Sequence, residues 1–274
     1  MTAVATQPIV FEAEFVTVQA VVDLSPHLRR VTFVAPRIAE AVTAGPDQRI
    51  KVLLPPPSGA EFTLPSGPDW YAVWCAQPEA DRFIMRTYTV RELRPEQCEM
   101  DIEFVLHGVN GPASAWATNV VPGDSVGLIL AFAVDTTSVK GLLNSGVDYV
   151  PPDTSKHRVL IADETALPAL TGILEQLPPD VHATVFAQVP DERDRRPLPT
   201  PGTADVTWLN SDDETMPLLE ALKAADLPAT VDFAWVAGES SMIKAVRRHL
   251  VNVVGLPKPS ISFQGYWKRG EAIG

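Results

Sequence analysis

The chain has 274 residues, of which 46 % are hydrophobic and 20 % are charged, and its formal net charge is −12. This length allows one large domain or two modest ones, with the composition of an ordinary globular protein. The negative charge argues against nucleic acid or an anionic membrane as the main partner, and no apolar run is long enough for a membrane helix. The N-terminal residues do not resemble a secretory signal. The two cysteines, Cys75 and Cys98, have no metal-ligand spacing, so we expect reduced thiols in a cytoplasmic protein.

The first half of the chain is predicted to be β-structure. Six short segments rich in β-branched and aromatic residues are bounded by proline, glycine or charged residues. They are residues 12–24, 28–36, 49–57, 70–76, 86–93 and 98–108. Six such strands separated by turns indicate a small antiparallel barrel. A helix is expected over 111–121, where Pro112 suits a first helical turn, and a last strand over 125–132.

The second half of the chain alternates between predicted strands and predicted helices. Residues 133–156 are expected to form a loop or linker, whose role the sequence does not indicate. Strands are then predicted over 157–163, 181–189, 205–210, 231–238 and 260–268, and helices over 165–177, 215–226 and 240–255. This alternation is typical of βαβ units and a parallel sheet. We therefore expect a β + α/β chain, with a barrel domain over 10–150 and an α/β domain over 151–274.

The stretch RTYTVR carries two arginines around a tyrosine and two threonines. Strand alternation places Arg86, Tyr88 and Val90 on one face and Thr87, Thr89 and Arg91 on the other. The tyrosine could lie flat against an aromatic ring, a threonine could offer its hydroxyl, and an arginine could pair with a phosphate. A barrel strand with solvated arginines is the alternative interpretation.

The stretch HGVNGPASAWA predicts a strand end, a glycine turn and a helix that begins at Pro112. Helix N-termini present free N–H groups to phosphate, and the small residues Ala113 and Ser114 would allow a close approach. The Ser114 hydroxyl would add a donor. A helix start with nothing bound is the alternative, and His107 taken alone is more often a structural residue.

Three further stretches lie where ligands could bind. Asp163, Glu164 and Thr165 follow a buried strand, and ligands of open α/β sheets bind beyond the carboxyl ends of strands, although these residues could simply cap a helix. Glu239 and Ser240 follow a later strand in the same way, and Arg247 and Arg248 suit the C-terminal end of the next helix. The final GYWKRG could line a ring-shaped anionic ligand or form a solvated tail. No G-x-G-x-x-G dinucleotide fingerprint is present.

The order of these stretches carries more information than any one of them. Together, RTYTVR, HG with GPASAWA, ADETALPA, AGESSMIKAVRRHL and GYWKRG resemble the siderophore-interacting protein family over about residues 10 to 270. Members of this family are FAD-containing ferric-siderophore reductases on a scaffold like that of ferredoxin–NADP reductase. DETALPA and GYWKRG are the specific parts, whereas Arg-x-Tyr-Thr is shared by a broader flavin reductase superfamily. One departure is Ala162, where the family often has glycine.

The resemblance implies a role for each matching residue. Arg86, Tyr88 and Thr89, continued by Thr87, Val90 and Arg91, would hold the isoalloxazine and a phosphate of FAD. His107 would reach the adenine side, Ala113 and Ser114 would take the pyrophosphate, and Trp116 would wall the site. Asp163, Glu164, Thr165 and Ala166 would face the nicotinamide side of the flavin, with Glu239 and Ser240 in the same cleft. Tyr266 and Trp267 would close over the flavin.

The activity that the resemblance implies is reduction of an Fe(III)-siderophore to Fe(II), which releases iron in the cytoplasm. Electrons would come from NADH, NADPH or a ferredoxin. The chain needs no iron ligands of its own, and none are evident, but it needs a basic docking patch for the chelate. The candidates are Lys51, Lys268 and Arg247 or Arg248. Two alternatives remain open: a general flavin or ferredoxin/flavodoxin reductase, and a flavin-bearing siderophore binder without turnover.

Overall fold

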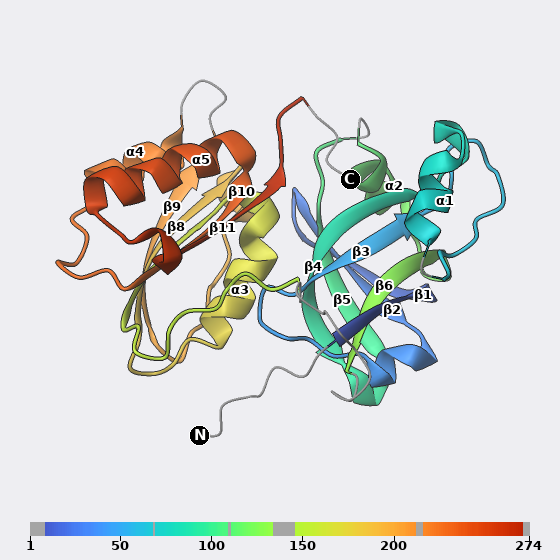
Figure 1. The fold of residues 1–274 in the computed structure, drawn as a ribbon, viewed down its shortest axis with the longest axis horizontal. Helices are drawn as coiled ribbons and strands as arrows, with labels where there is room; N and C mark the ends of the chain where they lie inside the picture. The colour runs from blue at the N-terminus through green and yellow to red at the C-terminus, as the bar shows by residue number, and fades with distance from the viewer. Residues whose placement is uncertain (1–8, 68, 109–110, 134–145, 212–215, 271–274) are drawn as a thin grey trace.

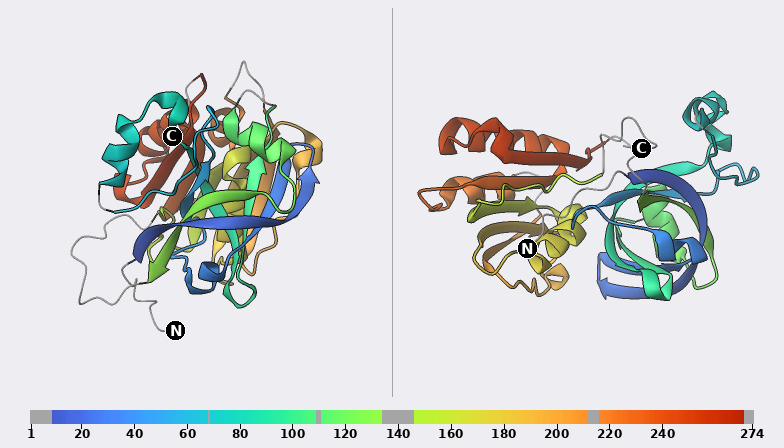
Figure 2. Two further views of the ribbon diagram at one scale, coloured as in Figure 1. Left: turned by 90° about the vertical axis from the view of Figure 1, so that its right-hand side faces the viewer. Right: turned by 60° about the horizontal axis from the view of Figure 1, so that its bottom comes forward.

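The structure is a computed structural model, which describes residues 9–67, 69–108, 111–133, 146–211 and 216–270. A β-barrel and a layered α/β unit lie side by side, as the views of Figures 1 and 2 show. The predicted β + α/β architecture is confirmed. The predicted linker over 133–156 lies partly outside the described residues, and the proposed domain boundary near residue 150 stays a prediction.

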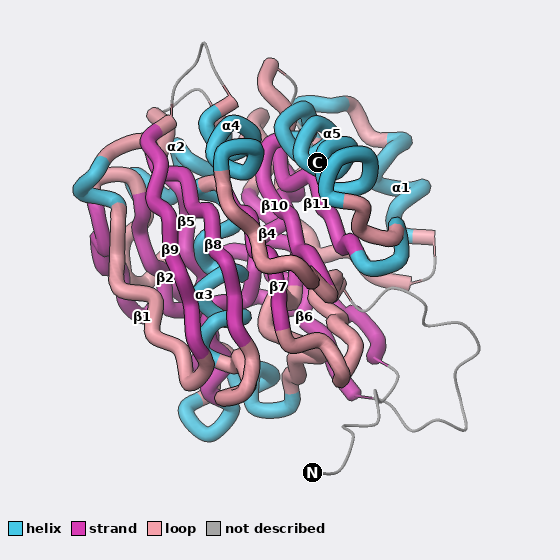
Figure 3. Tube along the Cα trace, turned by 90° about the vertical axis from the view of Figure 1, so that its left-hand side faces the viewer, coloured by secondary structure: helices cyan, strands magenta, loops and turns pink. Residues whose placement is uncertain are grey.

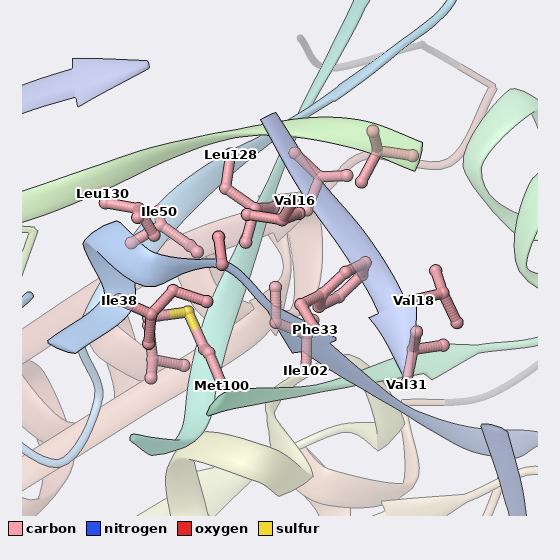
Figure 4. Packing of buried hydrophobic residues seen from close by; sticks show 14 of the residues in the cluster. Val16, Val18, Val31, Phe33, Ile38, Ile50, Met100, Ile102, Leu128 and Leu130 are labelled. Atoms are coloured by element: carbon pink, nitrogen blue, oxygen red, sulfur yellow. The ribbon is translucent and has the colours of Figure 1, made fainter. Parts of the chain in front are cut away.

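The barrel is closed by six antiparallel strands in the order β1-β2-β5-β4-β3-β6. The strands are β1 (Ile9–Ser25), β2 (Leu28–Val34), β3 (Arg49–Leu54), β4 (Ile84–Arg94), β5 (Glu99–Val105) and β6 (Ser125–Ala133). Alternate residues point inward, and Figure 4 shows Val16, Phe33, Ile102 and Leu128 packed in the barrel interior. This core, rather than backbone pairing alone, stabilises the barrel, because apolar burial is the dominant favourable term in folding.

The strand predicted over 70–76 is wrong, because these residues form the helix α1 (Trp70–Ala76). The segment belongs to an excursion between β3 and β4, and it pairs with none of the strands that the structure describes. Trp74 Nε1 donates to Phe83 O at 3.0 Å, and the aromatic rings pack on one another beside the barrel. Aromatic and β-branched residues favour a strand only where a pleated neighbour exists, so the local preference is overridden. The sixth barrel strand is β6.

The α/β unit has a parallel sheet in the order β11-β10-β7-β8-β9. Its strands are β7 (His157–Ala162), β8 (His182–Val189), β9 (Thr203–Asn210), β10 (Phe233–Glu239) and β11 (Ile261–Trp267). Helix α3 (Leu167–Glu175) covers the face toward the barrel, and α4 (Pro217–Ala224) and α5 (Ser240–His249) cover the other face (Figures 1 and 3). The chain runs outward from β7 in one direction and then from β10 in the other. The topological switch point of the sheet therefore lies between β7 and β10.

Ion pairs join the barrel to the α/β unit. Arg91 on β4 donates to both carboxylate oxygens of Glu175 on α3, at 2.6 and 3.0 Å. The Glu103 side chain on β5 is fully buried and accepts from Arg30 at 2.7 Å and from Arg196 of the α/β unit at 2.8 Å. Removing a partner from such a buried group costs more than losing a surface pair. These ion pairs thus hold the α/β unit against the side of the barrel that carries β4 and β5.

Candidate functional site

The site is built at the switch point, where Asp163 follows β7. Its carboxylate is almost fully buried, with an exposed fraction of 3 %. Oδ1 accepts from the N–H and hydroxyl of Thr165, and Oδ2 accepts from Glu239 N at 2.7 Å and from Trp267 Nε1 at 2.8 Å. The structure therefore brings Asp163 to the predicted place, but its oxygens are taken by the ends of β7, β10 and β11. Its part is to position Trp267.

Gly238 makes this arrangement possible. Its φ of 142° lies in a region that residues with a side chain rarely adopt, and a Cβ there would lie 2.4 Å from Asp163 Oδ2. This requirement at Gly238 was not predicted from the sequence. The available signal was a glycine directly before Glu239 at the end of a buried strand, where close backbone approach is common.

Glu164 is the acid beside this hub. Burial, together with the negative charge of Asp163, raises the pKa of Glu164 to about 8, and Arg269 opposes the rise. Burial also raises the pKa of Asp163, while its hydrogen-bond donors oppose that effect. The donors stabilise the ionised form of Asp163. We therefore assign the negative charge to Asp163 and a proton to Glu164 at neutral pH. Glu164 thus presents a neutral carboxyl group at the switch point.

Glu239 and Ser240 also lie at this edge, as predicted, yet their side chains serve the fold. Glu239 Oε2 accepts from Ser241 N and Met242 N and so caps α5. Ser240 Oγ donates to Trp267 O at 2.9 Å. The start of α5 and the C-terminal aromatic segment are therefore fastened together on both sides of Trp267. Thr165 and the buried Ala166 begin the turn that leads into α3.

On the barrel side, β4 carries RTYTVR past the same edge. The Tyr88 ring packs 4.4 Å from the Phe104 ring, and burial raises the pKa of its phenol. Val90 lies in the barrel core, and Thr87 is exposed, as alternation predicts. Thr89 is buried because β11 comes over it: its side chain lies beside the phenol of Tyr266, whose pKa is also raised by burial. This contact brings GYWKRG and RTYTVR together, as the family resemblance implies.

A basic cluster, Arg49, Lys51 and Arg86, lies on β3 and β4. Lys51 Nζ donates to Thr87 Oγ1 at 2.7 Å, and Lys51 has a lowered pKa through burial and the charges of Arg49 and Arg86. Arg86 Nη1 donates to the carbonyl of Met85 at 2.8 Å, which leaves further donors on the guanidinium. Neighbouring cations that lower the pKa of a lysine favour a bound anion beside it. Arg49 was not predicted, although it is two residues from Lys51 on the same strand face.

Arg91 does not join this cluster. The pairing of β4 with β5 shifts register between Val90 and Glu92, which is the mark of a β-bulge. The bulge turns Arg91 toward the α/β unit, where it pairs with Glu175 and lies 3.6 Å from Glu103. The predicted contact of Arg91 with the cofactor is thus replaced by a role in joining the two parts of the chain.

Helix α2 (Pro112–Asn119) begins near the end of β5. Ser114 is buried, and its hydroxyl accepts from His107 N at 3.0 Å and donates to Gly108 O at 2.7 Å. The hydroxyl is therefore not the predicted phosphate donor. Gly111 has no side chain that could cap the helix, and within the described part of the chain no side chain accepts from its first turn, so the N–H groups of Ala113 and Ser114 are the donors that a phosphate would meet. Trp116 packs against Phe33 and Phe104, so its side chain contacts the barrel core.

Of the predicted docking cations, Lys51 lies in the basic cluster and Lys268 follows Trp267 directly. Arg247 and Arg248 lie elsewhere. Helix α5 starts at the switch point and runs back along the sheet, so Arg247, seven residues after Ser240, lies about 10 Å farther along its axis. The structure does not bring these two arginines together with Lys51.

Comparison with known proteins agrees with this geometry. A family model described as siderophore-interacting protein matches residues 155–270, and one described as the siderophore-interacting FAD-binding domain matches residues 17–130. The chain belongs to the siderophore-interacting protein family. FAD is its cofactor.

The chain is similar to relatives of two kinds. Ferric vibriobactin reductase ViuB of Vibrio cholerae is 29 % identical over 252 residues, which are 90 % of this chain and 86 % of ViuB. The mycobactin import ATP-binding/permease protein IrtA of Mycolicibacterium smegmatis is 30 % identical over 259 residues; these are 94 % of this chain but only 26 % of IrtA. The crystal structure of the siderophore-interacting protein SipS of Aeromonas hydrophila superposes with a TM-score of 0.75 at 29 % identity, covering 96 % of this chain and 94 % of SipS.

The residues of the cleft fit FAD. Arg86 and the start of α2 suit its phosphates, and Tyr88 offers an aromatic side chain on the same strand as Arg86. Tyr266 and Trp267 lie over the same edge from the α/β side. In the part of the chain described here, no helix has both the length and the apolar character that a bilayer crossing needs.

Proposed function

We propose that this chain reduces Fe(III)-siderophores to Fe(II) in the cytoplasm, with electrons from NADPH or NADH. The observation that carries the proposal is the meeting of two groups at one edge: the basic cluster on β3 and β4 and the C-terminal aromatic segment held by Asp163. One group suits an anionic chelate, and the other covers the place where a flavin edge would lie. The relative ViuB, a ferric vibriobactin reductase, supports the same substrate class.

The docking surface for the chelate is proposed to be Lys51 with Lys268. Lys51 is half-buried beside Arg49 and Arg86, and because Arg49 already pairs with Asp148 at 2.8 Å, we assign the chelate to Lys51. Tyr266 lies beside Thr89, and Thr87, the partner of Lys51, is two residues farther along β4. Residues two apart on a strand face are separated by about 7 Å, and Lys268, two residues after Tyr266, is proposed to contact the same chelate.

The electron donor is proposed to dock at the switch point over Glu164. Ligands of open α/β sheets bind at this place, and a neutral carboxyl group there does not repel an anionic nucleotide. The chemistry comes from bound FAD, because a flavin takes two electrons from a nicotinamide and passes them on singly. One NAD(P)H thus reduces two ferric chelates, giving NAD(P)⁺, one proton and two Fe(II), whose hold by hard oxygen ligands is weaker.

A steady-state assay tests this proposal. FAD-loaded protein is given NADPH or NADH and a ferric siderophore, and Fe(II) is trapped by a coloured chelator. Lys51→Gln should raise the KM for the chelate about tenfold with little change in kcat, because docking is lost and the flavin remains. Lys156→Gln, which removes an exposed cation paired with Asp180, is the matched control. If NADPH or NADH reduces the flavin of the wild-type protein but no Fe(II) is released from the ferric siderophore, the proposal is contradicted.

A further inference from the structure

A basic pocket lies beside the C-terminal half of α5 and the strand β11. It has a volume of about 290 Å³ and is lined by the cations Lys244, Arg247, Arg248 and Lys258, with Asn252 and Phe263 completing most of the wall. These residues come from α5, from the π-helical turn Leu250–Val254, from the turn Lys258–Ser260 and from β11. Separate segments of the chain thus converge on one basic hollow.

No described residue neutralises the charge of this pocket through an ion pair. Among the residues that the structure describes, none of the four cations forms an ion pair or a hydrogen bond with a carboxylate. Elsewhere arginines are heavily paired: Arg94 alone contacts Glu92, Glu99 and Asp101. Four unpaired cations in one hollow stand out in a chain with a net charge of −12. Such a hollow attracts anions despite the overall field.

Arg247 is held in a fixed position inside the pocket. Its guanidinium carbon lies 4.3 Å from the centroid of the Phe263 ring, which is 44 % exposed. Its Nε is buried and has no hydrogen-bond partner among the described residues. A guanidinium stacked on an aromatic ring keeps its N–H fork available for a planar or tetrahedral oxyanion. The side chain is therefore oriented before any ligand arrives.

The helix dipole explains only part of this cluster. Arg247 and Arg248 lie in the last turn of α5, where cations are favoured. Lys258 belongs to a separate 3₁₀ turn after the helix, and Lys244 lies about one helical turn earlier. The dipole does not account for a hollow between them or for the amide of Asn252 on its wall.

We propose that this pocket binds a phosphate-bearing anion, with a phosphate monoester or pyrophosphate group among the cations. Several cations around one hollow match the multiple charge of such a group better than that of a single carboxylate, and arginine forks suit phosphate oxygens. The volume of about 290 Å³ lies at the low end for small-molecule sites, which favours a compact head group. The exposed ring of Phe263 leaves room for an adjoining apolar part. This site is separate from the flavin cleft, from which α5 carries Arg247 away.

Calorimetry with pyrophosphate tests the proposal on FAD-loaded protein, so that the phosphate positions of the cleft are filled. The double variant Arg248→Gln with Lys258→Gln changes two exposed side chains of the pocket. Its matched control is Lys156→Gln with Lys223→Gln, which removes the same charge from exposed cations elsewhere. We expect the pocket variant to bind pyrophosphate at least about tenfold more weakly and the control to bind within about twofold of wild type.

Vesicles distinguish the source of the phosphate group. If the natural ligand is a soluble phosphate ester, pyrophosphate binds and vesicles containing a phosphoinositide do not sediment with the protein. If it is a lipid head group, those vesicles sediment with wild type and the control but not with the pocket variant. Absence of binding to both probes, or equal binding by the pocket variant and the control, would overturn the proposal.

Discussion

Trp267 Nε1 donates to Asp163 Oδ2 at 2.8 Å, and this hydrogen bond links the last strand of the chain to the end of the first α/β strand. The same oxygen accepts from Glu239 N, so one buried carboxylate joins β7, β10 and β11. The site is therefore held by a residue whose carboxylate oxygens are all used inside the protein. The C-terminal aromatic segment depends on this carboxylate for its place over the barrel edge.

Replacing Asp163 by Asn should loosen this segment. The amide keeps one oxygen acceptor but turns a donor toward N–H groups, which leaves buried groups unsatisfied at a cost of about 1–3 kcal/mol. We expect a lower melting temperature, altered tryptophan fluorescence and slower flavin reduction. Asp153→Asn, at an exposed position, is the control. Unchanged fluorescence and unchanged flavin reduction in Asp163→Asn would contradict the positioning role.

Gly238→Ala tests the close approach at the same hub. The substitution places a Cβ within 2.4 Å of Asp163 Oδ2 at a φ of 142°, so we expect a loss of stability beyond about 2 kcal/mol. Gly123→Ala is the matched control, because Gly123 also has a positive φ, 99°, but open space around the added Cβ. Denaturant unfolding measures both. Equal losses in the two variants would mean that backbone strain, and not the carboxylate contact, decides the effect.

The raised pKa of Glu164 predicts that the free energy of unfolding depends on pH. Its pKa is about 8 in the folded chain against an ordinary value of 4.5, so the folded state holds the proton more tightly than the unfolded state. The stability that the neutral form contributes is complete below pH 4.5 and is lost as the pH rises to about 8. Glu164→Gln removes this loss.

Thermal unfolding at pH 6, 7, 8 and 9 measures the effect. The stability of Glu164→Gln relative to wild type should grow by about 1–2 kcal/mol between pH 6 and pH 8, because each unit of pKa difference corresponds to about 1.4 kcal/mol. Glu96→Gln, at an exposed position, should follow the wild-type profile. Parallel profiles for wild type and Glu164→Gln would show that the carboxyl group titrates normally.

Arg196 tests the connection between the two parts of the chain. It donates to the buried Glu103 at 2.8 Å and to Thr171 Oγ1 at 2.9 Å. Arg196→Ala should cost about 2–4 kcal/mol, because a buried carboxylate loses a partner. Arg193→Ala breaks an exposed pair with Asp191 and should cost less than about 1 kcal/mol. Similar unfolding midpoints for both variants would contradict a stabilising role for the Glu103 network.

Most of the architecture could be predicted from the sequence, because the period of apolar residues differs between the halves. The helices and strands of the α/β unit follow that period, and the barrel strands are interrupted by clear turn residues. The segment Trp70–Ala76 could not be predicted in this way, since its aromatic composition favours a strand and only the absence of a neighbouring strand makes it a helix.

The motifs indicated residues that lie near one another in the structure, whereas the ligand-binding role of each side chain stays a prediction. The bulge between Val90 and Glu92, which redirects Arg91 to Glu175, has no sequence signal of its own. The Ser114 hydroxyl is satisfied by His107 N and Gly108 O, a local turn geometry that a motif does not reveal. Motifs indicate which residues meet, whereas hydrogen-bond partners decide which of them remain available to a ligand.

The most direct test of the central claim is an anaerobic absorbance titration of the FAD-loaded protein. The flavin is first reduced with NADPH, NADH or dithionite, and a ferric siderophore is then added with an Fe(II) trap present. Our account predicts that the oxidised flavin bands return as about two Fe(II) are trapped per flavin, since a flavin releases two electrons singly. Flavin that stays reduced in the presence of excess chelate would contradict it and would leave a flavin-bearing siderophore binder.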